Sequence, residues 1–202
     1  MNELVKMVVV LTVLSASSGL LLATVRDKTM DQIKFQQLVN EKKPAIKSIL
    51  GETSNDPIQS RFEIKEGKKT VEFFVGSYNG IPNTIVFESF GTGYKGNIGL
   101  MVGVNLENDQ IQGIGVTTHS ETPGLGSRAK TDPAFAAQFV GKNLNNPLKV
   151  KPDGGEIDAL SGATITSRGV CIAASSASEI YKKLKPQLAE KAKLFSKNSK
   201  GE

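Results

Sequence analysis

Residues 84–117 decide the fold of this chain, and they read TIVFESFGTGYKGNIGLMVGVNLENDQIQGIGVT. β-Branched and aromatic residues favour strands, and here they predict strands at Thr84–Glu88, Gly96–Leu106 and Gln110–Thr117. Glu107-Asn108-Asp109 supplies turn residues between the last two strands. Because consecutive strands joined by short turns pair with each other, this stretch predicts the centre of a meander-like antiparallel sheet.

A hairpin precedes this stretch, and helices surround the sheet. Arg61–Ile64 and Thr70–Val75 predict two further strands around a glycine turn at residues 66–69. The predicted fold class is α+β, with a mainly antiparallel sheet and flanking helices. Apolar spacing, capping residues and proline breaks predict helices at residues 30–41 ending before Pro44, at 132–140 with Asp132 as cap, and from near Ser167 to Pro186.

The net charge of +5 is concentrated at one end of the chain. From Lys182 onward there are seven lysines and two glutamates, a net +5, so the remainder is formally neutral. A basic domain face for nucleic acid is therefore not supported. Since this end has no spread of arginine and aromatic residues, a solvated or lipid-headgroup-facing tail is a better interpretation than a nucleic-acid arm.

An uncharged stretch, Met7–Val25, lies near the start of the chain between two basic residues. As a helix it spans ~28 Å, enough for one bilayer crossing, and it predicts a membrane anchor. The alternative is a cleaved signal peptide, with Met7–Leu14 as its apolar region and small residues at 15–17 as a cleavage site. Apolar character resumes at residues 19–23, which favours the anchor. Basic residues are denser after the span, but long domains translocate largely regardless of charge.

The segment Asp158–Arg168 carries the candidate chemistry. Free N–H groups and the positive dipole end of a helix N-terminus bind anions such as phosphate, and Gly162 lets the backbone come close. The same residue types also favour a cap and turn that bind no ligand, so the residues alone leave both interpretations open. The hydroxyl and guanidinium donors around the Gly-Ala pair are Ser161, Thr164, Thr166, Ser167 and Arg168.

Three motifs in the chain resemble one known family. Asp158–Thr164 is similar to the flavinylation motif, an Asp, two variable residues and Ser/Thr-Gly-Ala-Thr, on whose last Thr a flavin transferase esterifies FMN. Residues 91–96 (GTGYKG) and 119–126 (HSETPGLG) look like two other signatures of the same FMN-binding domain, in the expected order and spacing. With the anchor included, the chain resembles the RnfG family, the G-type subunits of the Rnf ion-translocating electron transport complex. The related NqrC family, from the sodium-pumping quinone reductase, is the second match.

The resemblance implies a role for each motif residue. Thr164 would carry the FMN phosphoester, because the motif counted from Asp158 selects it over the competing acceptor Thr166. Asp158 would act in attachment and not in electron transfer. Tyr94 would stack on the flavin ring, or it is a half-buried strand aromatic, and both interpretations stay open. The phosphate would be surrounded by Ser161, Gly162, Ala163 and Thr166, and the ring system by Glu121, Thr122, Gly124, Leu125 and Gly126.

The function that the resemblance implies is electron relay. FMN would take and pass electrons between partner cofactors in a membrane-bound complex that couples ferredoxin and NAD chemistry to ion movement. The chain would be one component of an oxidoreductase and translocase, with no catalytic residues and no turnover alone. Implied partners are the other integral membrane, iron–sulfur and flavin subunits, and a flavin transferase for maturation. The family places the FMN domain on the extracytoplasmic side of the cytoplasmic membrane.

Two alternatives to the electron relay remain: a membrane-tethered module that binds a phosphorylated ligand without redox activity, and an independent extracytoplasmic flavin reductase.

The expected organisation of the chain follows from the anchor and the motifs. The expected parts are a membrane anchor at 1–28, a connecting helix and linker at 29–60, the FMN-binding α+β domain at 61–185 and a basic tail at 186–202.

The chain has one cysteine and one histidine, which excludes two kinds of site. Cys171 alone cannot form a disulfide or a thiolate metal cluster within the chain, and His119 alone cannot form a multi-histidine metal site. No metal site is expected. His119 is interpreted as a polar turn residue in preference to a flavin contact, and Cys171 as a small core residue in preference to a redox group.

Overall fold

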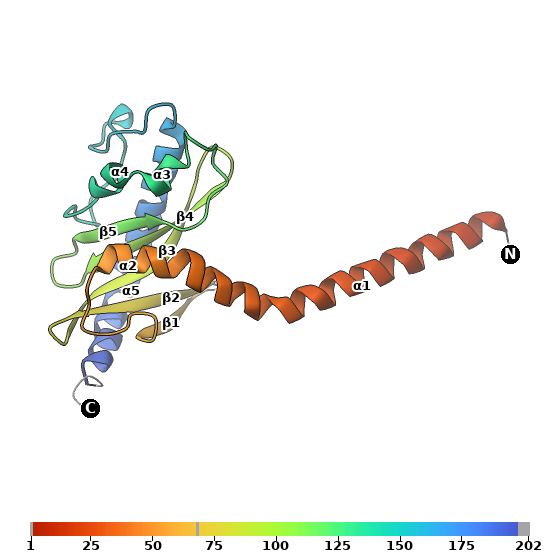
Figure 1. Ribbon diagram of the computed structural model, residues 1–202, viewed down its shortest axis with the longest axis horizontal. Coiled ribbons are helices and arrows are strands. Elements are labelled where there is room, and N and C mark those ends of the chain that lie inside the picture. The colour runs from red at the N-terminus through yellow and green to blue at the C-terminus, as the bar shows by residue number, and fades with distance from the viewer. Residues whose placement is uncertain (1, 68, 198–202) are drawn as a thin grey trace. The chain divides into compact units, whose positions relative to one another are not determined.

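The structure, a computed structural model, describes residues 2–67 and 69–197 and divides into two compact units (Figure 1). The first unit ends at Asn40 and consists mainly of α1 (Glu3–Gln37), whose large apolar side chains are exposed. Among the described residues, one helix is long and apolar enough to cross a membrane, Glu3–Met30 within α1. The predicted apolar helix is therefore present, and the second unit holds the rest of the chain.

The second unit is built on a five-stranded antiparallel sheet in the order β1-β2-β3-β4-β5. This order confirms the predicted meander. β3 extends beyond the predicted Thr84–Glu88 at both ends, because it pairs with β2 from Ile81 and with β4 as far as Thr92. The strands are β1 (Arg61–Glu66), β2 (Lys69–Tyr78), β3 (Ile81–Thr92), β4 (Asn97–Asn105) and β5 (Ile111–Val116).

Helices cover both faces of this sheet, which confirms the α+β fold class (Figure 1). α2 (Lys43–Leu50) lies on one face, and its Ile49 fills the space over Gly103 of β4. α5 (Thr164–Lys197) lies on the other face and packs mainly on β3. Because both faces are covered, β4 is buried along nearly its whole length. Fully burying one large apolar side chain contributes about 1.5–3 kcal/mol, so this double cover supplies much of the stability.

The predicted helix at residues 30–41 is part of a longer helical run. α1 ends at Gln37, and the π-helix η1 (Leu38–Lys42) separates it from α2. Pro44 does not end the run as predicted, because it lies in the first turn of α2, where its missing N–H has no helical partner to lose.

The connection between β5 and α5 contains short helices only. Asp132 caps α4 as predicted, since its carboxylate accepts the Ala134 N–H at 3.1 Å. α4 itself ends at Ala137 and not at the predicted Val140, and Gly141 follows with a φ of 78° that breaks the helical path. The helices are α3 (Arg128–Thr131), α4 (Pro133–Ala137) and the 3₁₀-helix η2 (Lys151–Asp153).

The prediction that Pro186 ends the last helix is wrong, because α5 continues to Lys197. A proline inside a helix costs about 3 kcal/mol. Packing offsets this cost: Leu188 and Ala192 are buried, and Phe195 stacks on Phe62 with ring centroids 6.0 Å apart. Of the predicted basic tail, residues 198–202 lie outside the described residues.

β3 and α5 approach most closely at two glycines. A Cβ on Gly91 would lie 2.1 Å from the carbonyl oxygen of Gly169 and 2.5 Å from the backbone nitrogen of Ala173. A Cβ on Gly169 would lie 2.8 Å from the carbonyl oxygen of Thr92. Beside them, Ser89 Oγ donates to the Ala173 carbonyl at 2.9 Å. Only residues without a side chain allow this approach, which brings the first turns of α5 to the β3–β4 connection.

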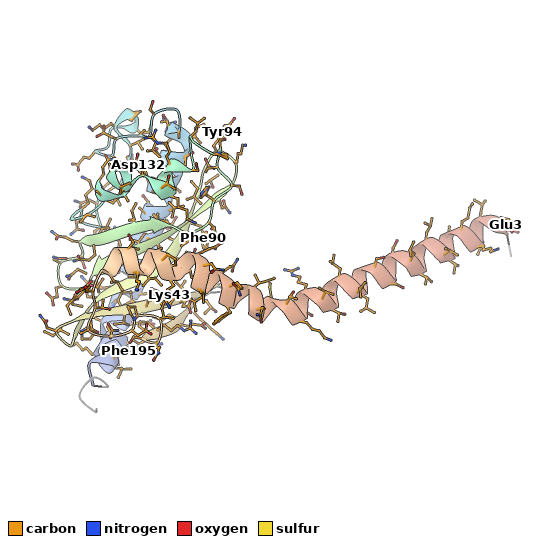
Figure 2. The ribbon with its side chains drawn as sticks, in the orientation of Figure 1. Glu3, Lys43, Phe90, Tyr94, Asp132 and Phe195 are labelled. Carbon is orange, nitrogen blue, oxygen red and sulfur yellow. The ribbon has the colours of Figure 1, made fainter. Side chains whose placement is uncertain are left out.

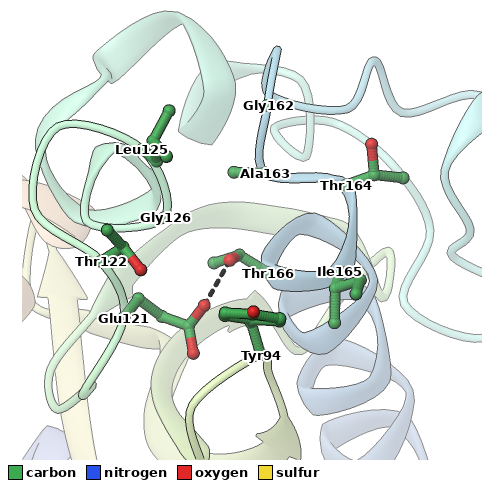
Figure 3. A pocket seen from close by; sticks show the side chains of 10 residues that line it. All are labelled: Tyr94, Glu121, Thr122, Leu125, Gly126, Gly162, Ala163, Thr164, Ile165 and Thr166. Carbon is green, nitrogen blue, oxygen red and sulfur yellow. Dashed lines mark hydrogen bonds between the residues drawn. The ribbon is translucent and has the colours of Figure 1, made fainter.

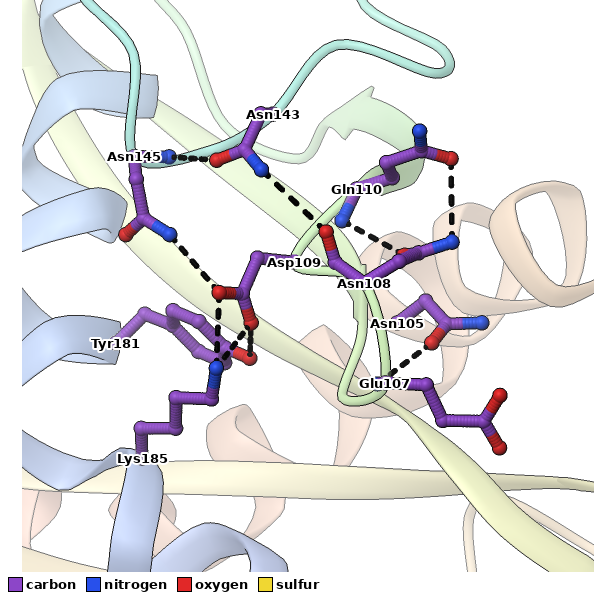
Figure 4. A network of polar contacts seen from close by, with 9 residues as sticks. All are labelled: Asn105, Glu107, Asn108, Asp109, Gln110, Asn143, Asn145, Tyr181 and Lys185. Atoms are coloured by element: carbon purple, nitrogen blue, oxygen red, sulfur yellow. Dashed lines mark hydrogen bonds and ion pairs between the residues drawn. The ribbon is translucent and has the colours of Figure 1, made fainter.

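A polar network ties the β4–β5 turn to α5 (Figure 4). The Asp109 carboxylate accepts from Tyr181 Oη at 2.6 Å, from Lys185 Nζ at 2.7 Å and from Asn145 Nδ2 at 3.0 Å. Burial by itself raises the pKa of Asp109, but the hydrogen bonds from Lys185 and Tyr181 outweigh it and hold that pKa below its usual value. The turn that the sequence predicted is therefore fixed to the core by a charged group.

The glycine contact predicts a large effect of Gly91→Ala. The added methyl group meets backbone atoms that cannot rotate away, so we expect the free energy of unfolding to fall by at least about 1–3 kcal/mol. Gly113→Ala on β5 is the matched control, because its Cβ would lie 3.3 Å from its nearest neighbour, Ile49 Cα. Urea denaturation measures both variants, and equal losses in the two would contradict the close approach.

The Asp109 network predicts an acid-dependent stability. Because the pKa of Asp109 is lowered in the folded state, its contribution is complete above its unfolded pKa of about 4 and is lost as pH falls through the folded pKa. Asp109→Asn keeps a residue that tolerates the φ of 59° at this turn, and it should lose about 1–3 kcal/mol at neutral pH. Urea denaturation at several pH values should show a smaller acid loss in D109N. Parallel pH profiles would disprove the assignment.

Candidate functional site

Three connecting segments meet at one end of the sheet, beside the first turn of α5 (Figure 3). They are Gly93–Gly96 between β3 and β4, residues 117–127 after β5, and residues 158–163 before α5. Side chains from all of them surround a cavity of about 540 Å³. Its lining consists of Tyr94, Glu121, Thr122, Leu125, Gly126, Gly162, Ala163, Thr164, Ile165 and Thr166.

A buried carboxylate joins two of these segments, 93–96 and 117–127, to the first turn of α5. Glu121 is 5% exposed, and its Oε2 accepts the hydroxyl of Thr166, which is 2% exposed (Figure 3). Its Oε1 accepts the Lys95 N–H at 2.9 Å. Gly126 leaves the space for this arrangement, since a Cβ there would lie 2.6 Å from Thr166 Oγ1. The motif residues that are distant in sequence are therefore connected through one side chain.

The Glu121 carboxyl group is ionised at neutral pH. Burial by itself raises its pKa, because a charge is less stable away from water. The hydrogen bonds from Thr166 and from the backbone N–H groups of Lys95 and Tyr94 outweigh burial and hold the pKa of Glu121 below its usual value. The cavity wall therefore carries a fixed negative charge.

The start of α5 differs from the sequence prediction. The helix was predicted to begin near Ser167, but it begins at Thr164. Ser167 therefore lies inside the helix, where its hydroxyl holds the preceding loop. Ser167 Oγ accepts the Leu160 N–H at 3.0 Å and donates to the Ala163 carbonyl at 3.1 Å. Gly162, with a φ of 75°, provides the turn between them. The first turn of α5 lines the cavity through Thr164, Ile165 and Thr166. The N–H groups of a first helical turn lack internal carbonyl partners, so they are available to a ligand there.

Most of the predicted anion donors have other partners. Arg168 forms a bidentate ion pair with Asp153, with both N···O distances 2.7 Å. Ser167 holds the loop, and Thr166 donates to Glu121. Thr164 differs from them: its side chain is half-buried, lines the cavity and makes no hydrogen bond to another described residue. Figure 3 shows its hydroxyl directed away from the Glu121–Thr166 bond.

Three predicted site residues do not line the cavity. Ser161 is exposed, and Gly124 is exposed in the turn, where its N–H donates to Ser127 Oγ at 2.9 Å. Asp158 lies on the surface, paired with Lys151 at 2.7 Å. The other predicted residues do line the cavity.

Two aromatic or aliphatic residues complete the wall. Tyr94 is 64% exposed and lies outside both β3 and β4, so the interpretation as a half-buried strand aromatic is wrong. Ile165 also lines the cavity and was not predicted. Its position between the two motif threonines gave no signal of this, because an apolar residue in a helix usually faces the core.

The histidine and the cysteine lie outside the cavity lining. His119 Nδ1 accepts the Glu121 N–H at 3.3 Å, which fits the predicted polar turn residue. Cys171 is buried in α5, and burial together with the Asp153 charge raises the pKa of its thiol to about 12. A protonated buried thiol is a packing group. Within the described parts of the chain, no group of three or more metal-ligating side chains is present.

The segments that form the cavity match a known family of domains. The sequence model of the FMN-binding domain family matches residues 93–179 of this chain. That range begins at the β3–β4 connection and includes all three segments that form the cavity.

Two solved structures share the fold. The C subunit of the Na⁺-translocating NADH-quinone reductase of Parabacteroides distasonis is 24% identical and has a TM-score of 0.57, with 81% of this chain and 96% of that one covered. The second, NqrC of Shewanella oneidensis, is 27% identical and has a TM-score of 0.53, covering 75% and 74%.

The relatives found by sequence define the family of the whole chain. The G subunit of the ion-translocating oxidoreductase complex of Methanosarcina acetivorans is 35% identical over 178 residues, covering 87% of this chain and 93% of the relative. Its counterpart in Shewanella oneidensis is 30% identical over 181 residues, covering 83% and 84%. The chain therefore belongs to the RnfG family, the G subunits of the ion-translocating oxidoreductase complex.

Proposed function

We propose that this chain is an electron-transfer component of an Rnf-type ion-translocating oxidoreductase complex, with FMN in the cavity attached by a phosphoester to Thr164. The observation that carries the proposal is the contrast between two threonines. Thr166 is buried and donates to Glu121, while Thr164 lines the cavity at the start of α5 and its hydroxyl has no described partner. Thr164 is thus the hydroxyl available for esterification.

The residues at the cavity fit FMN in size and chemistry. A volume of about 540 Å³ is within the usual range for small-molecule sites, roughly 300–1,000 Å³. Tyr94, Leu125 and Ile165 provide apolar surface for a planar ring. The first turn of α5 provides N–H groups and a positive dipole end for a phosphate. The cavity therefore offers surfaces suited to both chemically different parts of FMN.

We assign the remaining residues by this division. At the phosphate end, Gly162 and Ala163 hold the backbone close, with Ser161 at the rim. At the ring end, Thr122, Leu125 and Gly126 line the space and Gly124 shapes their turn, with Tyr94 as the stacking group. Asp158 serves attachment, and its surface position leaves it accessible to a flavin transferase. No residue acts as a general acid or base.

The proposed role is relay, without turnover by the chain alone. A bound flavin supplies the capacity to accept and donate electrons, and the protein orients it and excludes water from one side. The donors and acceptors are partner subunits of the complex, which couples ferredoxin and NAD chemistry to ion translocation. Residues 1–28 anchor the chain in the cytoplasmic membrane, and the FMN domain, which includes α2 on its sheet, faces the extracytoplasmic side.

Mass spectrometry of the native protein tests the attachment. We expect the peptide containing Thr164 to carry one FMN phosphate, because its hydroxyl is the available acceptor. Thr164→Ala should lose this mass and the yellow colour, whereas the matched control Thr166→Ser, which keeps the donor to Glu121, should retain both. An unmodified native peptide, or flavin that persists on T164A, would reject the covalent assignment.

Protease accessibility tests the proposed side of the membrane. In intact cells stripped of outer layers, added protease should digest the FMN domain, since it lies outside the cytoplasmic membrane in our proposal. A cytoplasmic enzyme serves as the control and should remain intact. Protection of the domain until the cells are lysed would place it on the opposite side.

A further inference from the structure

The buried carboxylate of Glu121 connects parts of the site and also places a negative charge at the cavity wall. None of the ion pairs formed by the described residues includes Glu121. Its hydrogen-bond partners are the Thr166 hydroxyl and the backbone N–H groups of Lys95 and Tyr94, which are neutral donors. Neutral donors stabilise the carboxylate but leave its net charge in place. The cavity wall therefore carries a negative charge at Glu121, and no described lysine or arginine side chain forms an ion pair with it.

Holding the loops does not by itself require a charge. A glutamine at residue 121 has the same length and could accept the Lys95 N–H through its amide oxygen. Its amide N–H₂ could donate to Thr166, because a threonine hydroxyl rotates and can accept as well as donate. Most of the hydrogen-bonded geometry is thus available to a neutral side chain. The property that only the carboxylate supplies is the negative charge.

A negative charge at this wall opposes the addition of electrons to a group in the cavity. Reduction of a flavin ring by two electrons and one proton adds one negative charge, whereas reduction by two electrons and two protons adds none. A nearby buried anion raises the free energy of the first product, and low local polarity makes the effect stronger than in water. The size of the effect depends on how far the ring is from the carboxylate.

We propose that the Glu121 carboxylate lowers the reduction potential of the flavin in this cavity. The proposal rests on the proposed function, because it needs FMN bound beside Glu121. Glu121 acts as a tuning and positioning residue, through its charge and its bonds to the β3–β4 connection and to α5. It exchanges no electron or proton in this role.

Redox titration of the FMN-loaded full chain in detergent tests the proposal. Dithionite supplies the electrons, and flavin absorbance reports the ratio of reduced to oxidised flavin at each solution potential. In Glu121→Gln we expect this ratio, at a fixed potential, to rise by about tenfold. Glu156→Gln is the matched control, because it removes the same charge from an exposed carboxylate outside the cavity and should leave the ratio unchanged.

The outcomes separate this proposal from the proposed function. A wild-type chain that carries no FMN would refute the proposed function and, with it, this inference. A loaded E121Q protein with an unchanged or lowered potential would refute the inference alone. If E121Q does not load, Thr122→Lys adds an opposite charge at the same wall, and the side chain of Thr122 makes no hydrogen bond to another described residue. A potential raised in T122K supports the inference, and an unchanged one overturns it.

Discussion

The close approach of β3 and α5 at Gly91 and Gly169 is the constraint on which the rest of the structure depends. Backbone contact at this point allows the helix to run directly against the strand, so its first turn reaches the β3–β4 connection. A side chain at either position would separate the two elements. The cavity would then lose the wall that Thr164 and Thr166 provide, and Thr166 would lose Glu121 as its partner. The glycines thus determine where the helix start, and hence the proposed phosphate end, can lie.

The sheet was predictable from sequence because its signals are local. β-Branched runs and turn residues gave the meander, and the strand limits erred mainly at both ends of β3 (residues 81–83 and 89–92) and at the end of β2 (residues 76–78). Glycine and proline weaken strand propensity in these stretches. The helix ends were less predictable because tertiary contacts decide them. Ser167 has the residue type of a cap but closes a loop, and Pro186 lies inside a helix that buried Leu188 and Ala192 hold to the core. Neither contact has a signature in the local sequence.

The candidate site was predictable in composition but not in its chemistry. The motifs located nearly all the cavity residues, through resemblance, while residue types alone left an anion site and a simple cap equally open. Arg168 looked like an anion donor, and its pairing with Asp153 depends on the path of a distant loop. Thr164 and Thr166 have identical side chains, so no propensity distinguishes them. Burial and the Glu121 bond distinguish them in the structure.

The central claim is that FMN occupies the cavity through a phosphoester, and ³¹P NMR of the native protein tests it most directly. The phosphorus of attached FMN is a diester, which does not ionise near neutral pH, whereas a phosphate monoester has a second pKa of about 6. We predict one protein-bound resonance that survives dialysis and keeps a constant chemical shift between about pH 5 and pH 8. A resonance that titrates over this range, disappears on dialysis, or is absent from the start would contradict the account.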